Sequence, residues 1–131
     1  MMLKRYDENL DIGKGLRWGT LKYGLCSYFA LAYAKTHPSV TSFLSIREYD
    51  EDMQKEYLVH YLVVQPDGSF LDAEGRYSKW ETSIEEMTDV SFMEIRQSIV
   101  NKSDIETCIE EDMGFDTELF QTICQFVQEH Y

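Results

Sequence analysis

The sequence predicts an α+β fold, in which an N-terminal helix carrying a cysteine packs on an antiparallel sheet and additional helices follow towards the C-terminus. Three patterns support this expectation. Residues 25–36 have apolar side chains at helical spacing, residues 57–65 are apolar on both strand faces, and residues 117–129 alternate between an apolar and an acidic or amide face. Such segments are typical of a buried helix, a central strand and a surface helix.

Length and composition indicate one domain, spanning residues 1–131. Apolar residues make up 44% of the chain, which is enough for a hydrophobic core without disulfides. No apolar run approaches the roughly 20 residues that span a bilayer, so we expect no membrane contact. The first residues turn acidic before any apolar segment, which argues against a signal peptide. Three cysteines without CxxC spacing indicate a reducing, cytoplasmic environment.

Charge is distributed unevenly along the chain. The formal net charge is −12, and residues 81–131 contribute 13 acidic but only two basic residues. An acidic surface repels phosphate backbones, so nucleic-acid binding is not expected. The acidic C-terminal region is either a solvated surface or a patch that docks a basic protein partner.

The N-terminal third predicts an irregular arm followed by a helix. Residues 1–22 mix charges with glycines and suggest at most a short helical turn, in which Trp18 joins the core or lines a groove. The helix over 25–36 ends before Pro38. Cys26 falls in its first turn, where free backbone N–H groups and the helix dipole favour an anion.

Strands are expected over 40–49, 57–65 and 69–73. The acidic loop after the first of them lacks the spacing and glycine of a calcium-binding loop, so no metal is expected there. The second and third strands flank the turn Pro66-Asp67-Gly68.

The length of that turn decides which face Asp72 occupies. A two-residue loop would pair Pro66 with Ser69 and turn Asp72 away from His60. A three-residue loop suits proline at its first position and glycine at a left-handed position. It pairs Gln65 with Ser69 and places Asp72 on the face of His60, within side-chain reach. We favour the three-residue loop.

The C-terminal half predicts short helices and one more strand. Capping-box patterns at Ser83–Glu86 and Ser103–Glu106 each predict a helix start, and the second helix should end at Gly114. Residues 90–100 alternate in part and predict a strand. The amphipathic helix over 117–129 follows.

Three residues could form a catalytic constellation. A cysteine nucleophile needs a lowered pKa, a base and a group that orients the base. Cys26 at a helix start, His60 on the central strand and Asp72 on the next strand have these properties. An oxyanion hole would use the backbone N–H of Cys26 and a donor from Trp18, Thr20 or Lys22.

The same residues carry a resemblance to a known family. Gly24-x-Cys26-x-x-Phe29-Ala30, His60-x-x-Val63 and Asp67-Gly68-x-Phe70-x-Asp72-Ala73-x-Gly75 resemble the core of the transglutaminase-like branch of the papain-like superfamily. The resemblance covers residues 20–76. It implies Cys26 as nucleophile, His60 as base and Asp72 as orienting residue. Leu62 stands where that family often has a tryptophan, and neighbouring Tyr61 could substitute for it.

The sequence therefore leaves two functions open. The first is a cysteine-dependent hydrolase or acyl transferase, which acts without a cofactor on a peptide, isopeptide or glutamine amide through a Cys26 thioester. The second is a non-catalytic acidic binding or inhibitor protein on the same scaffold, with Cys26 and His60 as ordinary core residues. Metal binding by the three residues would lack a fourth ligand.

Overall fold

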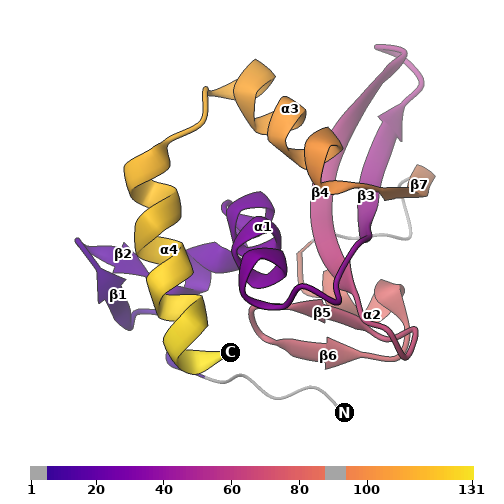
Figure 1. The fold of residues 1–131 in the computed structure, drawn as a ribbon. Coiled ribbons are helices and arrows are strands. Elements are labelled where there is room, and N and C mark those ends of the chain that lie inside the picture. Colours follow the sequence, from indigo (N-terminus) through magenta and orange to yellow (C-terminus); the bar gives the residue numbers. More distant parts are fainter. Residues whose placement is uncertain (1–5, 88–93) are drawn as a thin grey trace.

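The computed structural model describes residues 6–87 and 94–131 and has the expected α+β architecture (Figure 1). Its centre is an antiparallel five-stranded sheet in the order β6-β5-β4-β3-β7. The strands are β3 (Phe43–Asp50), β4 (Lys55–Val64), β5 (Phe70–Asp72), β6 (Gly75–Tyr77) and β7 (Glu94–Val100). The helices are α1 (Cys26–Thr36), α2 (Trp80–Ile84), α3 (Lys102–Asp112) and α4 (Thr117–His130).

The N-terminal arm is more regular than the sequence suggests. It forms a small hairpin, β1 (Asp11–Gly13) with β2 (Leu16–Arg17), and then the 3-10 helix η1 (Trp18–Leu21). Trp18 is buried in the core, and its indole N–H donates to the Tyr131 hydroxyl at 2.9 Å. The arm is thereby tied to the C-terminal residue of the chain.

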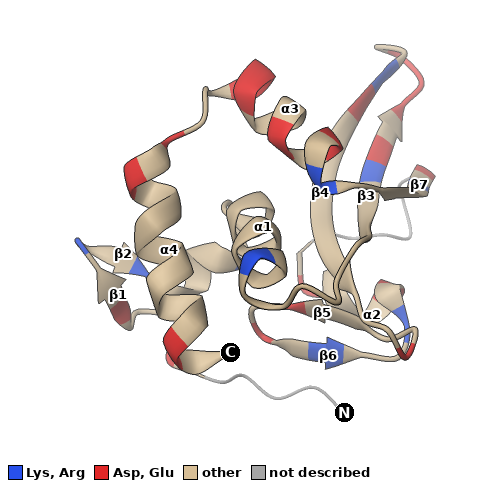
Figure 2. Cartoon of the chain, in the orientation of Figure 1, with Lys and Arg blue, Asp and Glu red and all other residues tan. Residues whose placement is uncertain are grey.

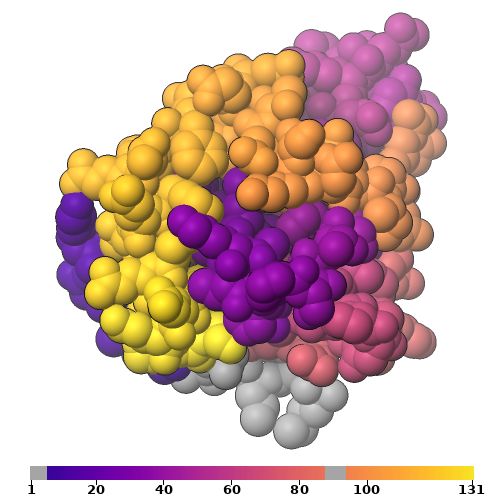
Figure 3. All heavy atoms as spheres, viewed as in Figure 1, coloured from indigo at the N-terminus to yellow at the C-terminus, as the bar shows by residue number. Residues whose placement is uncertain are grey.

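Helix α1 is the centre of the larger core. It lies between α4 and the sheet, with α3 above it in the view of Figure 1. Its sequence carries a single charged residue, Lys35, and seven of its eleven residues are buried. A helix that is apolar nearly all round is stable only when neighbours cover every side. In Figure 3, α4 (yellow) and α3 (orange) frame α1 and the loop after it.

The opposite face of the sheet carries a smaller core. This core contains Tyr77 of β6 and Ile84 of α2. Leu44, Ile46 and Leu62 of the two central strands belong to the same cluster. Their strand neighbours Phe43, Tyr61 and Val63 belong instead to the core around α1. This alternation follows from the two-residue period of a strand.

The β4–β5 hairpin has the register that the three-residue loop predicts. The backbone N–H of Gln65 donates to the Ser69 carbonyl at 2.8 Å, and Val63 pairs with Leu71. Gly68 adopts φ +88°, the left-handed conformation that favours glycine. Local turn chemistry alone therefore predicts the face of Asp72 correctly.

Several predicted boundaries are wrong. The first strand begins at Phe43 rather than at residue 40, and β4 starts at Lys55, inside the predicted loop. The pattern Ser83–Glu86 does not start a helix, because α2 begins at Trp80 and ends at Ile84. Strand β6 has no counterpart among the predictions. Strand β7 confirms the predicted strand from Glu94 on, while residues 90–93 lie outside the described part of the chain.

Both C-terminal helices start with a side-chain cap. Helix α3 is capped by Asn101, whose side chain accepts from the Asp104 N–H while the Asp104 carboxylate accepts from the Asn101 N–H. The capping box is real but begins two residues before the predicted Ser103. Helix α4 is capped by Asp116 and runs one residue beyond the predicted end.

Carboxylates gather on α3 and near both ends of α4 (Figure 2). All five acidic residues of α3 are exposed, namely Asp104, Glu106, Glu110, Glu111 and Asp112. Within residues 6–87 and 94–131, no helix combines the length and apolar character needed to cross a membrane.

Candidate active site

Cys26 is the first residue of α1, and its position depends on the turn before it. Gly24 adopts φ +157°, a conformation that L-residues with side chains rarely adopt. The Leu25 N–H donates to the Thr20 carbonyl at 2.8 Å, which closes the turn after η1. The backbone N–H groups of the first helical turn have no acceptor within the helix. They point towards the N-terminal end of α1, where Cys26 lies.

The first turn of α1 reaches the sheet at an open strand edge. His60 and Asp72 share the face of Leu62, which is the face opposite the body of α1. The pairing of β4 with β5 stops at Val63, so at Tyr61 β4 is paired with β3 on one side and its other edge, towards β5, is open. The Tyr61 N–H interacts with the Cys26 sulfur there. Cys26 therefore meets His60 around the edge of β4 and not through packing of the helix onto the His60 face.

A bulge lies directly before His60. His60 pairs with Ile46, but the next pair is Leu58 with Arg47, so Val59 is an extra residue in β4. Bulges increase the local twist and redirect side chains. Here the bulge separates the buried end of β4 from its exposed end, and His60 is the first fully buried residue after it.

His60 and Asp72 are in direct contact. His60 Nε2 lies 2.9 Å from Asp72 Oδ2, and both side chains are buried. Because a carboxylate accepts hydrogen bonds, Nε2 carries the proton of this contact. The other carboxylate oxygen, Asp72 Oδ1, accepts from the N–H groups of Glu74 (2.9 Å) and Gly75 (3.3 Å) and from the Tyr77 hydroxyl (3.1 Å). The orienting carboxylate is thus held rigidly.

Cys26 and His60 shift each other's pKa in opposite directions. Burial by itself raises the pKa of the Cys26 thiol, but hydrogen bonding and charge from His60, with help from the Tyr61 and Ser27 N–H groups, lower it below its usual value. Burial by itself lowers the pKa of His60, but its contacts with Asp72 and Cys26 raise it to about 9. These directions favour a thiolate–imidazolium pair over a neutral thiol beside a neutral imidazole.

The two ring nitrogens of His60 differ in their contacts. Nε2 is occupied by Asp72, while Nδ1 is buried and has no hydrogen-bond partner within the described residues. Nδ1 is consequently the atom left to face the thiol. A protonated imidazole with one nitrogen on a carboxylate and the other on a thiolate satisfies both of its donors.

The sequence does not predict the buried charged cluster that lies beside Asp72. Lys22 Nζ lies 3.0 Å from the Tyr77 hydroxyl, 3.6 Å from Asp72 Oδ2 and 3.5 Å from Glu74 Oε1. The side chains of Lys22 and Glu74 are each 2% exposed. No local pattern announces a buried lysine, because lysines are almost always on the surface. The nearest signal is the acidic pair Asp72 and Glu74 beside a strand.

A cleft of about 330 Å³ opens onto the thiol. Its lining includes Cys26 and the residues before it, Lys22, Tyr23 and Gly24, on one side. Glu48, Leu58, Val59 and Met87 complete it. Tyr23 and Leu58 are exposed, so the mouth offers apolar contact area to an incoming ligand. Although Cys26 is only 7% exposed, it is therefore reached from a concave surface.

The expected oxyanion donors are only partly available. The Trp18 N–H donates to the Leu10 carbonyl at 2.8 Å, and the Lys22 N–H donates to the Gly19 carbonyl at 3.3 Å. Both are therefore committed to the turn. The N–H of Cys26, at the helix start, remains suited to the role, and Thr20 is the remaining candidate for the second donor.

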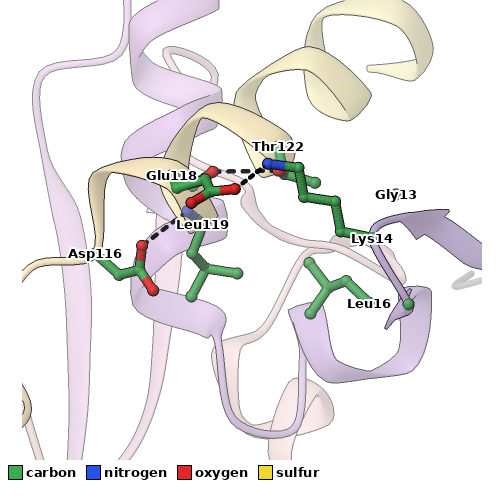
Figure 4. Close-up of a pocket in the computed structure, with 8 residues that line it drawn as sticks. Gly13, Lys14, Leu16, Asp116, Glu118, Leu119 and Thr122 are labelled. Carbon is green, nitrogen blue, oxygen red and sulfur yellow. Dashed lines mark hydrogen bonds and ion pairs between the residues drawn. The ribbon is translucent and has the colours of Figure 1, made fainter.

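Other cavities and histidines lie away from this constellation. A second cavity, of about 290 Å³, separates the β1–β2 hairpin from the start of α4 and is bridged by the Lys14–Glu118 ion pair (Figure 4). Its lining holds neither cysteine nor histidine. His37 stacks on Tyr33, with ring centroids 3.8 Å apart, and His130 contacts Tyr6. Within the described part of the chain, no group of three ligating side chains is arranged to hold a metal ion.

Comparisons with known proteins identify no relative. No family model matches the chain, and neither a curated protein nor a solved structure matches it.

Proposed function

We propose that this protein is a cysteine-dependent hydrolase or acyl transferase that acts on an amide of a protein or peptide. Cys26 is the nucleophile, His60 the acid and base, and Asp72 the residue that orients His60. The observation that carries the proposal is the buried hydrogen bond between His60 and Asp72, next to a thiol whose pKa is lowered by His60. The likeness of residues 20–76 to the transglutaminase-like branch of the papain-like superfamily supports the same reading.

The reaction would proceed through a thioester. The Cys26 thiolate attacks the carbonyl carbon, and the electron pair of the C=O bond moves to oxygen beside the N–H of Cys26. As the tetrahedral intermediate collapses, the C–N bond breaks and His60 gives its Nδ1 proton to the leaving amine. His60 then takes a proton from water or from an acceptor amine. The deprotonated water or amine attacks the thioester carbonyl, the C–S bond breaks, and Cys26 leaves as a thiolate.

Cysteine alkylation tests the activated thiol directly. We expect iodoacetamide at pH 7 to label Cys26 at least about tenfold faster than Cys108 and Cys124, read by mass spectrometry of peptides. Exposure predicts the reverse order, since Cys26 is buried and the other two are half-buried. The two other cysteines are thus internal controls. Equal, slow labelling of all three would overturn the proposal.

The cleft indicates the kind of substrate. Its apolar contact area comes from Leu58, Val59 and Met87, and Glu48 adds a carboxylate. An extended peptide with an apolar residue near the reacting amide fits such walls.

All three cysteines are free, which agrees with a cytoplasmic location.

A second candidate function rests on the acidic helices. The five exposed carboxylates of α3 would dock a basic protein, and the cysteine would then have no chemical part. This reading predicts salt-sensitive association that survives Cys26→Ala. The enzymatic reading predicts instead that Cys26→Ala folds normally but loses thioester formation.

A further inference from the structure

The charged groups behind His60 form a nearly sealed set. Asp72, Glu74 and Lys22 have side chains exposed by 1%, 2% and 2%, and His60 is fully buried. Lys22 comes from the turn before α1, Asp72 from β5 and Glu74 from the turn between β5 and β6. Two segments that are distant in the sequence, the turn before α1 and the β5–β6 hairpin, therefore meet to bury two carboxylates and one ammonium group.

Lys22 contacts both carboxylates at nearly equal distances. Its Nζ lies 3.6 Å from Asp72 Oδ2, the oxygen that also receives His60, and 3.5 Å from Glu74 Oε1. Its hydrogen bond goes to the Tyr77 hydroxyl, which in turn donates to Asp72 Oδ1. Lys22 thus reaches Asp72 twice, through charge and through Tyr77.

Formal charges explain why the set has these members. Asp72, protonated His60 and the Cys26 thiolate together carry one negative charge. Lys22 without Glu74 would neutralise that charge and draw Asp72 away from His60, whereas Glu74 without Lys22 would bury a second uncompensated carboxylate. Together Lys22 and Glu74 cancel, so that one carboxylate charge remains for His60.

We propose that Lys22 and Glu74 are positioning residues, a buried compensating pair that fixes the Asp72 carboxylate and sets the electrostatic field around His60 and Cys26. The inference rests on the proposed function, because it assigns the pair a role in activating the same thiol. Neither residue touches the reacting atoms.

Other titratable groups also face this set. Tyr77 of β6 contacts Asp72, and burial together with the charges of Asp72 and Glu74 raises the pKa of its hydroxyl. Tyr23 lies near Glu74, and burial and that carboxylate raise the pKa of Tyr23 too. Glu86 and Glu8 act on Tyr23 from further away. Both tyrosines therefore stay protonated through the neutral range, and the variants below leave them in place.

The test is the pH profile of Cys26 alkylation by iodoacetamide in four full-length proteins, namely wild type, Lys22→Met, Glu74→Gln and the double variant. Removing the positive charge disfavours the thiolate, so Lys22→Met should move the midpoint up by at least about half a pH unit. Removing the negative charge should move it down by a similar amount in Glu74→Gln. The double variant has the formal charge of the wild type and should return to within about 0.3 pH units of it.

Opposite shifts that cancel distinguish a field effect from packing. If the pair were only structural, both single variants would lose reactivity at every pH without opposite midpoint shifts, and that result overturns the inference. Where Lys22→Met fails to fold, Glu74→Gln against the double variant still gives the sign. A wild-type profile without a lowered midpoint would overturn the proposed function itself, whatever the variants do.

Discussion

The two halves of this protein bury different kinds of side chain. The half around the site, from η1 to β6, buries Lys22, His60, Asp72 and Glu74. The two C-terminal helices bury only apolar residues among those described, namely Ile105, Ile109, Ile123, Phe126 and Val127. Their charged residues, most of which are acidic, lie on the outside.

This difference indicates two roles: the buried apolar residues stabilise the fold, whereas the buried charged residues contribute little to stability. Burying a charge is unfavourable unless partners compensate it, and replacing a buried ion pair by apolar residues is often neutral or stabilising. Four buried ionisable groups are therefore a poor way to stabilise a domain of this size. Apolar packing of α3 and α4 against α1 stabilises at no such cost. This contrast favours a chemical role for the first half.

The strongest test of the contrast removes the base. His60→Gln should reduce the alkylation rate of Cys26 at pH 7 by about 10²–10³-fold, because the thiolate loses its counter-charge. His37→Gln is the matched control, since His37 stacks on Tyr33 at the far end of α1. The rate constants come from peptide mass spectrometry. A loss below about threefold in folded His60→Gln would place the activation elsewhere.

An apolar residue of α4 should behave in the opposite way. Ile123→Ala is expected to lower the free energy of unfolding by about 2–5 kcal/mol, because Ile123 is fully buried in the core around α1. The alkylation rate of Cys26 should stay within about twofold of wild type at a temperature where the variant is folded. Urea unfolding measures the first quantity.

Ile99→Ala provides the matched control for Ile123→Ala. Ile99 is 62% exposed on edge strand β7, and its truncation should change stability by less than about 0.5 kcal/mol. A large loss of Cys26 reactivity in folded Ile123→Ala would mean that the two halves are not independent.

Much of the fold follows from local sequence signals. The Pro66-Asp67-Gly68 turn specifies the hairpin register because proline and glycine fit few backbone conformations. That register alone brings Asp72 to the face of His60. The helix α1 and the strand β4 follow equally from their apolar patterns.

The charged cluster behind the site does not follow from local signals. Lys22 and Tyr77 are 55 residues apart and meet only because η1 and β6 converge on Asp72. Cys26 can approach His60 at the edge of β4 only because β5 is short. The sequence does not show where a strand of three residues ends. Contacts of this kind come from topology and cannot be read from spacing.

The pH dependence of stability offers a finer test of the Cys26–His60 pair. The pKa of His60 is raised to about 9, so its stabilising contribution is full below its unfolded pKa of about 6.5 and is lost as pH rises through 9. The pKa of Cys26 is lowered, so its contribution is present above its unfolded value and is lost as pH falls. Between pH 6.5 and 9 the two slopes oppose each other.

Wild-type stability should therefore change little between pH 6.5 and 9. In Cys26→Ser the slope of the thiol is lost and the contact with Asp72 still raises the pKa of His60, although by less than in wild type. The free energy of unfolding should then fall by about 1–2 kcal/mol as pH rises over this range. Urea unfolding at three pH values measures both proteins. Parallel curves for the two proteins would show that thiol and imidazole do not exchange a proton in the folded state.

The smallest expected effect concerns the start of α3, in the half without buried charges. Asn101→Ala removes the side chain that caps this helix and should lower the free energy of unfolding by about 1 kcal/mol. Ser103→Ala, at the residue that the sequence pattern suggests as the cap, lies inside the helix and should be nearly neutral. If Ser103→Ala lowered the free energy of unfolding more than Asn101→Ala does, the helix would start at Ser103, as the sequence pattern predicts. Because the cap is far from the thiol, neither substitution should alter Cys26 alkylation, which would confirm that the acidic helices stabilise the fold without tuning the site.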